Sequence, residues 1–459
     1  MPGPIVITSL AYLLAAFAAL YMSRKRNPLP PGPKGLPLIG NLHELPYEYP
    51  WLTYAQWAKK YGPIFSFKVF GSTTIVINSF KVATELIEKR STNYSDRPRM
   101  IMADELMEWA WSFIHMPYAD RWRRHRKMFH QYFQPRVLST YHPSQTEMTI
   151  KLLRQLSCTP EEFGSHIKHY VGSLALKVAY GYEVKPKDDF YVQLVGIAME
   201  PLLLVVHGNH LVDFLPFLKH IPEWFPGAGF KRLAKDGAKR TRDLRDIPFN
   251  AVKKSMADGS AQQSFAYEIL EKVKANNPNS QEEEEIIKNC AGIIYLAGSD
   301  TTSSFLLAWM LAMAQYPQVQ RTAQEQLDKV VGKARLPEFS DRSSLPYFEA
   351  MMLETLRWHS IVPLAAPHRA IQEDEFEGYN IPAGATVTIN TCLCPGRHFA
   401  MDTAWIAMAS ILTTYHIFKA ADITATEIDP TDFTDGLVSH PKPYKLRIMR
   451  RPSTSIVFT

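Results

Sequence analysis

The chain is poor in cysteine: its 459 residues include only Cys158, Cys290, Cys392 and Cys394. Four cysteines so distributed do not form a disulfide framework, which favours a reducing compartment. A net charge of +6 is too small to indicate a nucleic-acid-binding protein, and we expect no nucleic acid as a partner. Neither repeats nor low-complexity tracts interrupt the sequence, and its length suffices for a large buried core.

Charge is absent from residues 5–22, an apolar run near the minimum length that crosses a bilayer. Basic residues do not precede this run, as a cleaved secretory signal would require, but follow it at 24–26. Their position predicts a cytosolic C-terminal side. A buried core helix is the alternative interpretation. The prolines that follow favour a stiff spacer, so we expect a membrane anchor at 1–26, a proline-rich hinge at 27–45 and one domain at 46–459.

Strand-like patterns are short and few, at 63–70, 73–78 and 386–389. Most of the remaining sequence reads as helix, and one helix is expected to run from residue 281 to 316, before Pro317. The pattern therefore predicts a mainly α protein with small β-sheets.

The middle of the long predicted helix, AGSDTT at 297–302, is unusually polar for a helix interior. Glycine costs about 1 kcal/mol there, and serine and threonine hydroxyls compete for the backbone carbonyls. A tolerated polar patch is the plain interpretation. The alternative is a groove in which Asp300 and Thr301 face a reactive group.

Two further motifs combine charge with apolar or aromatic neighbours. Glu354 and Arg357 lie three residues apart on a helix whose apolar flanks predict a buried, positioning pair, although most such pairs are solvated. In the basic run 121–127, Trp122 and Arg126 share a helix face that suits an anionic group. The other basic side chains form either a solvated face or a docking surface for an acidic partner.

In this order the motifs resemble those of the microsomal cytochrome P-450 haem-thiolate monooxygenases, in particular the fungal ones. The resemblance covers nearly the whole chain, and each motif is weak alone but the ordered set is strong. It rests on the anchor and hinge, W-x-x-x-R at 122–126, A-G-x-D-T-T at 297–302, E-x-x-R at 354–357, PLAAPHR at 363–369 and C-P-G-R-x-x-A at 394–400. The implied fold is the mainly α P-450 fold with small β-sheets, behind one transmembrane helix.

The resemblance implies a cofactor, haem b (iron protoporphyrin IX), with the thiolate of Cys394 as the metal ligand. A thiolate ligand pushes electron density onto the iron and favours O–O cleavage. Propionate contacts are implied for Trp122, Arg126 and His368. Gly396 and Ala297 are the other implied cofactor-binding residues, because they leave room for the porphyrin.

The implied reaction is insertion of one oxygen atom from O2 into an apolar organic substrate, in fungal secondary metabolism or xenobiotic oxidation. Asp300 would relay protons and Thr301 would orient water. Glu354 and Arg357 would brace the core behind the haem, and the loop 100–116 would cap the pocket. The implied substrate pocket is lined by Ile293, Ala297, Leu364, Ala365 and Ala366.

The implied partners are membrane lipid, an apolar small molecule and an NADPH-cytochrome reductase, a flavoprotein that delivers electrons from NADPH. Cytochrome b5 is a second candidate electron donor. The implied location is the endoplasmic reticulum membrane, with a single pass and a cytosolic catalytic domain. The sequence does not choose among polyketides, terpenoids, aromatic xenobiotics and lipids as substrates.

What the chain lacks is the approach to Cys394. The family has a long meander there, an arginine that joins the Glu–Arg pair, and a loop of pattern F-x-x-G-x-R-x-C. The corresponding loop positions hold Val387, Asn390 and Cys392, and only 40 positions separate Glu354 from Cys394. We therefore expect a truncation between the last strand of the sheet and the cysteine loop, and we hypothesise that this chain binds haem poorly or not at all.

Two other functions remain open on the sequence alone. The chain could be a catalytically inactive, membrane-tethered haem- or lipophile-binding relative. Alternatively, Cys392, Cys394 and His398 could bind zinc, but a fourth ligand is missing from the sequence around them.

Overall fold

The computed structural model describes residues 27–205, 210–276, 281–389, 396–420, 432–452 and 454. The expected anchor at 1–26 lies outside these ranges, as do residues 390–395 with Cys392 and Cys394. Within the described ranges, none of the helices combines the length and the apolar character needed to cross a bilayer.

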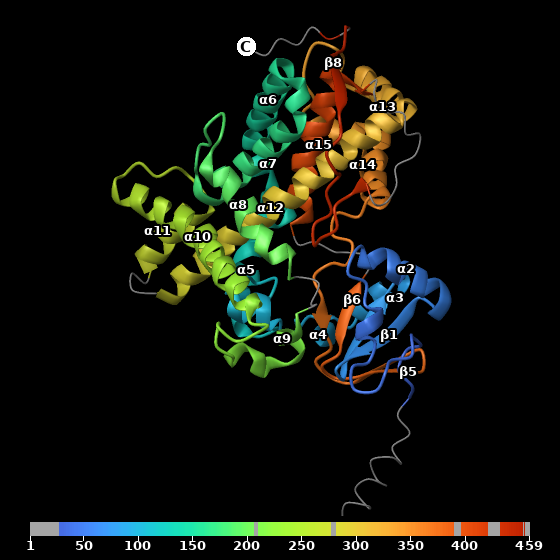
Figure 1. The fold of residues 1–459 in the computed structure, drawn as a ribbon. Helices are drawn as coiled ribbons and strands as arrows, with labels where there is room; N and C mark the ends of the chain where they lie inside the picture. The colour runs from blue at the N-terminus through green and yellow to red at the C-terminus, as the bar shows by residue number, and fades with distance from the viewer. Residues whose placement is uncertain are drawn as a thin grey trace, which may run out of the picture.

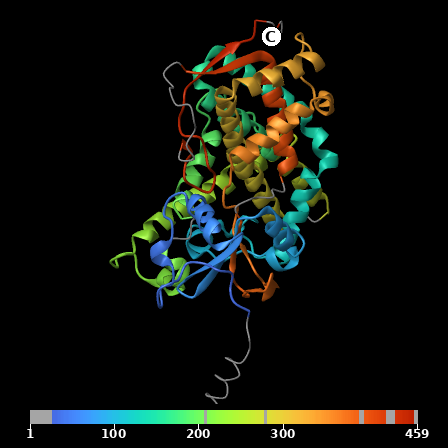
Figure 2. The ribbon, with the colours of Figure 1, turned by 90° about the vertical axis from the view of Figure 1, so that its right-hand side faces the viewer.

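Helices form most of the molecule, which confirms the predicted mainly α fold with small sheets. They stack above the N-terminal sheet in both ribbon views (Figures 1 and 2). The α-helices are α2 (Pro50–Tyr61), α3 (Phe80–Ala83), α4 (Ser91–Tyr94), α5 (Asp120–Phe133), α6 (His142–Cys158), α7 (Phe163–Tyr180), α8 (Phe190–Leu203), α9 (Leu211–Phe214), α10 (Gly229–Ala257), α11 (Phe265–Asn276), α12 (Gln281–Gln315), α13 (Pro317–Val330), α14 (Pro346–Trp358) and α15 (Arg397–Thr414). Shorter helical turns are η1 (Leu42–Glu44), η2 (Thr84–Glu88), η3 (Ile101–Leu106), η4 (Trp109–Trp111), η5 (Pro135–Tyr141), η6 (Pro160–Glu162), η7 (Pro216–His220) and η8 (Phe339–Ser344).

One sheet joins the start of the chain to its last third. Its order is β1-β2-β6-β3, with β2 and β6 parallel and the other pairs antiparallel. The predicted strands at 63–70, 73–78 and 386–389 are confirmed to within one residue. The strands are β1 (Ile64–Val69), β2 (Ser72–Ile77), β3 (His368–Arg369) and β6 (Thr386–Ile389), with separate hairpins β4–β5 (Asp374–Phe376, Tyr379–Ile381) and β7–β8 (Tyr415–Lys419, Leu446–Arg450).

The long helix α12 runs through the middle of the helical body (Figure 1) and packs against α7, α5, α10, α11 and α15. Its observed end at Gln315 is one residue short of the predicted one. Three glutamates, 282–284, lie in its first turn, where the positive end of the helix dipole favours negative charge. Most residues from Ile286 to Ala314 are buried; apart from the single positions Lys288 and Leu311, the burial is interrupted by one run of residues, and that interruption marks the candidate site.

Candidate active site

That interruption is a window at residues 297–301, which are only half-buried in the middle of the otherwise buried helix α12. The hydroxyl of Thr301 donates to the carbonyl of Ala297 at 2.8 Å, and Ser299 donates to Tyr295 at 2.6 Å. The hydroxyls therefore bond back within the helix, which stays continuous. The predicted acid and alcohol, Asp300 and Thr301, therefore lie in a half-buried stretch of a continuous helix.

Asp300 does not stand alone in this window. Its Oδ1 lies 3.1 Å from Nε2 of His440, a residue of the loop that precedes β8. The sequence analysis missed His440, because 140 positions separate it from Asp300 and its surroundings carry no periodic pattern.

Two of the predicted propionate contacts, Trp122 and His368, are linked to the neighbouring residues Asp96 and Arg97. Trp122, half-buried on α5, packs edge-on against the ring of Tyr118 at 5.0 Å, and the backbone N–H of Tyr118 donates to Asp96 at 2.8 Å. Arg97 Nη1 donates to the carbonyls of Ala366 (2.6 Å) and Pro367 (2.8 Å), immediately before His368. Arg126, also half-buried, lies on α5 one turn after Trp122.

Arg97 is a second residue that the sequence analysis missed. It extends between the segment before α5 and the segment before β3, where a guanidinium suits an anionic group. Its sequence signal is weak, an arginine between Asp96 and Pro98 with no helical or strand period.

His368 is neutral at physiological pH. Burial, reinforced by the positive charge of Arg97, lowers the pKa of His368 to about 3. Its Nδ1 is buried without a hydrogen-bond partner among the described residues. Buried polar atoms rarely stay unsatisfied, so this nitrogen points to a missing polar partner. A carboxylate held by His368 and Arg97 fits this arrangement, and the residues present therefore suit a haem propionate.

The carboxylate of Asp96 connects the segment before α5 with strand β3. The residue is 3% exposed, and its carboxylate accepts hydrogen bonds from the Tyr118 N–H and from the Arg369 guanidinium, with Nε at 2.7 Å. Burial alone would raise its pKa, but these hydrogen bonds outweigh burial and hold the pKa of Asp96 below its usual range. Asp96 therefore ties the entry of α5 to β3.

Glu354 and Arg357 form the predicted pair, but the prediction that it is buried is wrong. Arg357 Nη2 lies 2.6 Å from Glu354 Oε1, yet the two side chains are 74% and 57% exposed, respectively. Their neighbour Leu353 is 57% exposed, whereas Met352 is fully buried. Helix α14 thus buries one face only, and no element in the described part of the chain covers the other. An exposed pair of this kind contributes little to stability.

The predicted pocket residues separate into two groups. Ala297 lies in the window, and Leu364 and Ala366 are half-buried. Ile293 and Ala365 are buried, at 3% and 6% exposure. Ala365 also has a φ of 54°, an unusual left-handed backbone for a residue with a Cβ. The tight turn at Ala365 directs the chain from α14 into β3 and places His368 beside Arg97.

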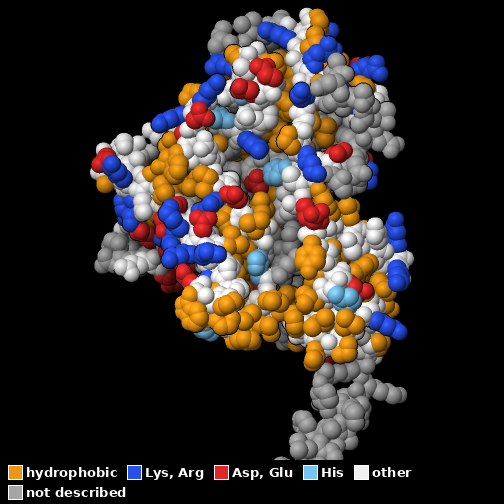
Figure 3. Space-filling view, in the orientation of Figure 1, with side chains coloured by type: hydrophobic (Ala, Val, Ile, Leu, Met, Phe, Trp, Pro, Cys, Tyr) orange, Lys and Arg blue, Asp and Glu red, His pale blue; other side chains and the backbone are white. Residues whose placement is uncertain are grey.

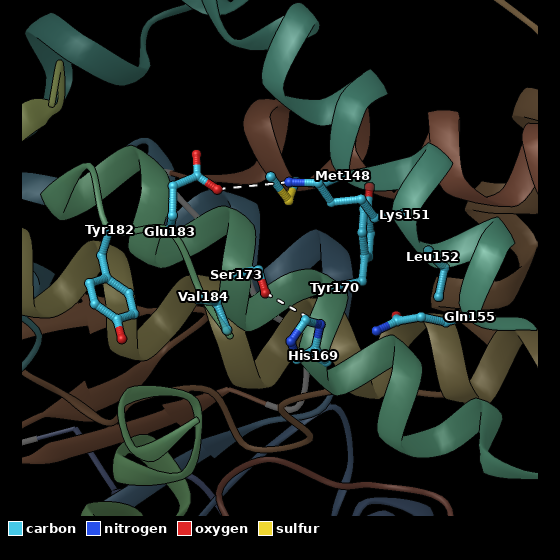
Figure 4. A pocket seen from close by; sticks show the side chains of 10 residues that line it. All are labelled: Met148, Lys151, Leu152, Gln155, His169, Tyr170, Ser173, Tyr182, Glu183 and Val184. Carbon is cyan, nitrogen blue, oxygen red and sulfur yellow. Dashed lines mark hydrogen bonds and ion pairs between the residues drawn. The ribbon is translucent and has the colours of Figure 1, made fainter. Parts of the chain in front are cut away.

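Two pockets elsewhere contain none of these residues. Figure 4 shows one between α6 and α7, lined in part by Met148 and Tyr170, with room of about 30 Å³, enough for a water molecule. The other, of about 230 Å³, lies between α10 and the segment 104–111. Arg121, Arg242 and Arg245 are among its lining residues; Arg242 pairs with Glu108, and Arg245 pairs with Asp246.

The remaining predicted positions adjoin the undescribed cysteine loop. Gly396 is the N-cap of α15, and His398 is exposed on the first turn of that helix.

Arg124, from the predicted docking surface, pairs with Glu282 and Glu283 at the start of α12. Across the described ranges, no three His, Cys, Asp or Glu side chains gather as a metal site.

His359, at the end of α14, makes a pH-dependent contribution to stability that can be tested. It is 8% exposed, and burial lowers the pKa of His359 to about 4, although its hydrogen bond to the Ser439 carbonyl opposes the shift and the charge of His440 adds to it. The unfolded chain binds a proton at this residue below pH 6.5 and the folded chain only below about pH 4. Stability is therefore lost as pH falls through this window, by at most about 3 kcal/mol.

We expect His359→Gln, which keeps a donor but does not titrate, to flatten the decline in unfolding free energy between pH 6.5 and 4. Urea unfolding at several pH values measures this. His43→Gln, at an exposed position in η1, is the matched control and should leave the profile unchanged. Identical profiles for His359→Gln and the parent would contradict the assignment.

The chain matches known proteins along almost its whole length. The family model described as cytochrome P-450 matches residues 30–393. Cytochrome P-450 monooxygenase 136 of Postia placenta is 34% identical over 500 positions, covering 98% of this chain and 94% of that protein. Cytochrome P-450 monooxygenase COX1 of Coprinopsis cinerea is 34% identical over 494 positions, covering 96% and 95%. Tryptamine 4-monooxygenase of Psilocybe cyanescens is 34% identical over 477 positions, covering 93% and 94%.

The chain therefore belongs to the cytochrome P-450 family and is an oxidoreductase of the monooxygenase type, as the resemblance predicted. Membership implies haem as the cofactor and a reductase as the source of electrons. When bound, a haem with a thiolate ligand supplies the activation of dioxygen.

Proposed function

We propose that this protein inserts one oxygen atom from O2 into an apolar organic substrate, with haem b ligated by Cys394 and with NADPH as the electron source. A flavoprotein NADPH-cytochrome reductase would deliver the electrons, and cytochrome b5 is the proposed second donor. The observation that carries the proposal is the window at 297–301, where an acid and an alcohol interrupt a buried helix.

The proposed roles follow from the contacts of the chain's own residues. Trp122, Arg126, His368 and the newly found Arg97 hold the propionates, while Gly396 and Ala297 leave room for the macrocycle. Thr301 orients a water molecule at the window. The carboxylate of Asp300, partly open to solvent, moves protons between that water and the surface.

Reconstitution with hemin tests this proposal. A thiolate-type carbon monoxide difference spectrum, lost in Cys394→Ser, together with NADPH-dependent product formation would support it. Stoichiometric haem without that spectrum and without product would contradict it and favour the inactive haem- or lipophile-binding relative. Zinc found by elemental analysis in place of iron would favour the metal cluster at Cys392, Cys394 and His398.

We also propose that a segment is missing between β6 and Cys394 and that its absence weakens haem binding. An alignment with cytochrome P-450 monooxygenase claR of Ampulloclitocybe clavipes spans 506 positions. Because the chain has 459 residues, at least 47 of those 506 positions fall opposite gaps in it. The exposed Glu354–Arg357 pair supports the same proposal, because the segment proposed to be missing would carry the arginine that joins this pair in the family.

The proposed location is the endoplasmic reticulum membrane, with the anchor at 1–26 and a cytosolic domain. Hydrophobic side chains gather on the lower face of the molecule in Figure 3, over α9 and the N-terminal sheet. A single face this rich in exposed apolar side chains is typical of a membrane or protein contact. The exposed residues around α9 are Leu204, Leu211, Phe217, Trp224 and Phe225, at 48–81%.

We expect Trp224, which is 81% exposed, to reach the lipid in the full-length protein. In vesicles of brominated lipids, the parent should lose more tryptophan fluorescence than Trp224→Phe does. Trp405→Phe, which removes a fully buried indole, is the matched control and should leave the fraction quenched by lipid almost unchanged. Equal quenching of parent and Trp224→Phe would place this face away from the bilayer.

A further inference from the structure

A hairpin loop between Asp432 and Lys442 closes on itself beside α12. The Lys442 N–H donates to the Asp432 carbonyl at 2.7 Å, and the Thr434 N–H donates to the His440 carbonyl at 2.6 Å. The His440 N–H returns a hydrogen bond to the Thr434 hydroxyl at 2.9 Å. These bonds give the loop a defined shape of its own.

Two helices hold this loop through one residue, Ser439. Its carbonyl accepts from the hydroxyl of Ser304 on α12 at 2.5 Å and from Nε2 of His359 at 3.1 Å. Its N–H donates to the carbonyl of Ile361 at 2.9 Å. Ser439 is 1% exposed, so these hydrogen bonds are shielded from water. The backbone immediately before His440 is therefore fixed to α12 one turn beyond Asp300.

The imidazole of His440 is aimed at the carboxylate of Asp300. Nε2 lies 3.1 Å from Oδ1, and the side chains are 21% and 26% exposed, respectively. The Nδ1 atom of His440 is buried without a hydrogen-bond partner among the described residues. Among the described residues, the contact with Asp300 therefore orients this ring.

We infer that His440 is a positioning residue that acts through Asp300. It holds one carboxylate oxygen of Asp300 in place at the window, next to Thr301. A carboxylate without this anchor could rotate toward solvent, and proton delivery would then lose its geometry. The inference rests on the proposed role of Asp300. His440 does not belong to any of the motifs identified in the sequence.

The catalytic test compares His440→Leu with His440→Gln in the haem-loaded protein, measuring product formed per NADPH consumed. We expect His440→Leu to lower this ratio on the order of tenfold, with haem content and substrate binding unchanged. His440→Gln, whose amide donor reaches a similar distance, should recover most of the ratio. His43→Leu, at an exposed histidine of η1, is the matched control and should match the parent.

Asp300→Asn separates positioning from a merely structural role. If His440 acts through Asp300, adding His440→Leu to Asp300→Asn lowers the product ratio no further. A second full tenfold loss in the double variant would overturn the inference, as would a parent-like ratio in His440→Leu alone.

Thermal unfolding tests the contact without any turnover. The fall in melting midpoint of the double variant should be smaller than the sum of the two single falls, because His440→Leu removes, and Asp300→Asn weakens, the same interaction. Additive midpoints would overturn the pairing itself. If the midpoints are non-additive, the contact between His440 and Asp300 is present. If the same haem-loaded protein nevertheless forms no product, the proposed function is contradicted, and with it the role of His440 in catalysis.

Discussion

If a segment is missing before Cys394, as proposed, restoring it is expected to raise the haem content to about one haem per chain. The change replaces residues 390–392 by the stretch of the Postia placenta relative that aligns opposite the proposed gap. The segment would return the loop whose N–H groups hold the thiolate, and it would cover the Glu354–Arg357 face of α14. Haem per chain and the carbon monoxide difference spectrum measure the effect.

A glycine–serine insert of equal length is the matched control, because it restores chain length but not the loop or the covering face. It should leave haem content at the level of the unmodified chain. If the unmodified chain binds as much haem as the restored chain, about one per chain, and shows a thiolate-type spectrum, then haem binding does not require the segment.

Asp96→Ala should produce the largest loss of stability among single substitutions at the site. The carboxylate is buried, and its removal leaves the Tyr118 N–H without its acceptor and the Arg369 charge without its partner. Removing one partner of a fully buried pair costs about 3–5 kcal/mol. Arg369 is 41% exposed and can be rehydrated, so we expect about 2–3 kcal/mol.

The same substitution should also reduce haem uptake, because Asp96 fixes Arg97 and the entry of α5 together. Urea unfolding and haem titration measure the two effects. Asp120→Ala, which removes a carboxylate that is 94% exposed and pairs with Arg123, is the matched control and should change neither. An Asp96→Ala protein with parental stability would show that Arg369 and Tyr118 find other partners.

Most of the fold could be predicted from the sequence, because short local patterns mark where its strands and helices begin and end. The strand patterns at 63–70, 73–78 and 386–389 became β1, β2 and β6 to within one residue. Pro317 correctly marked the end of α12. Alternation and proline are properties of a few neighbouring residues, and no tertiary contact overrides them here.

The candidate site could be predicted only in part, because its organising contacts join distant segments. Trp122, Asp300 and His368 carry motif signals, but Arg97 and His440 carry none. Their importance depends on contacts with residues 366–367 and with Asp300, more than a hundred positions away in each case. Local patterns hold no information on such pairs.

The Glu354–Arg357 prediction failed for a related reason. The apolar flanks of the pair did predict a buried helix face, and Met351 and Met352 occupy it. Whether the opposite face is also covered depends on a different segment of the chain. The periodicity of one helix carries no information about that other segment.

The open face of α14 has a consequence in the cell. Leu353 and Leu356 are 57% and 37% exposed beside a charged pair, so the folded chain displays apolar side chains of the kind that chaperones and proteases use to identify incomplete proteins. We therefore expect the polypeptide to accumulate to a low level in the cell, however well it is translated. Its abundance would be set by degradation and not by synthesis.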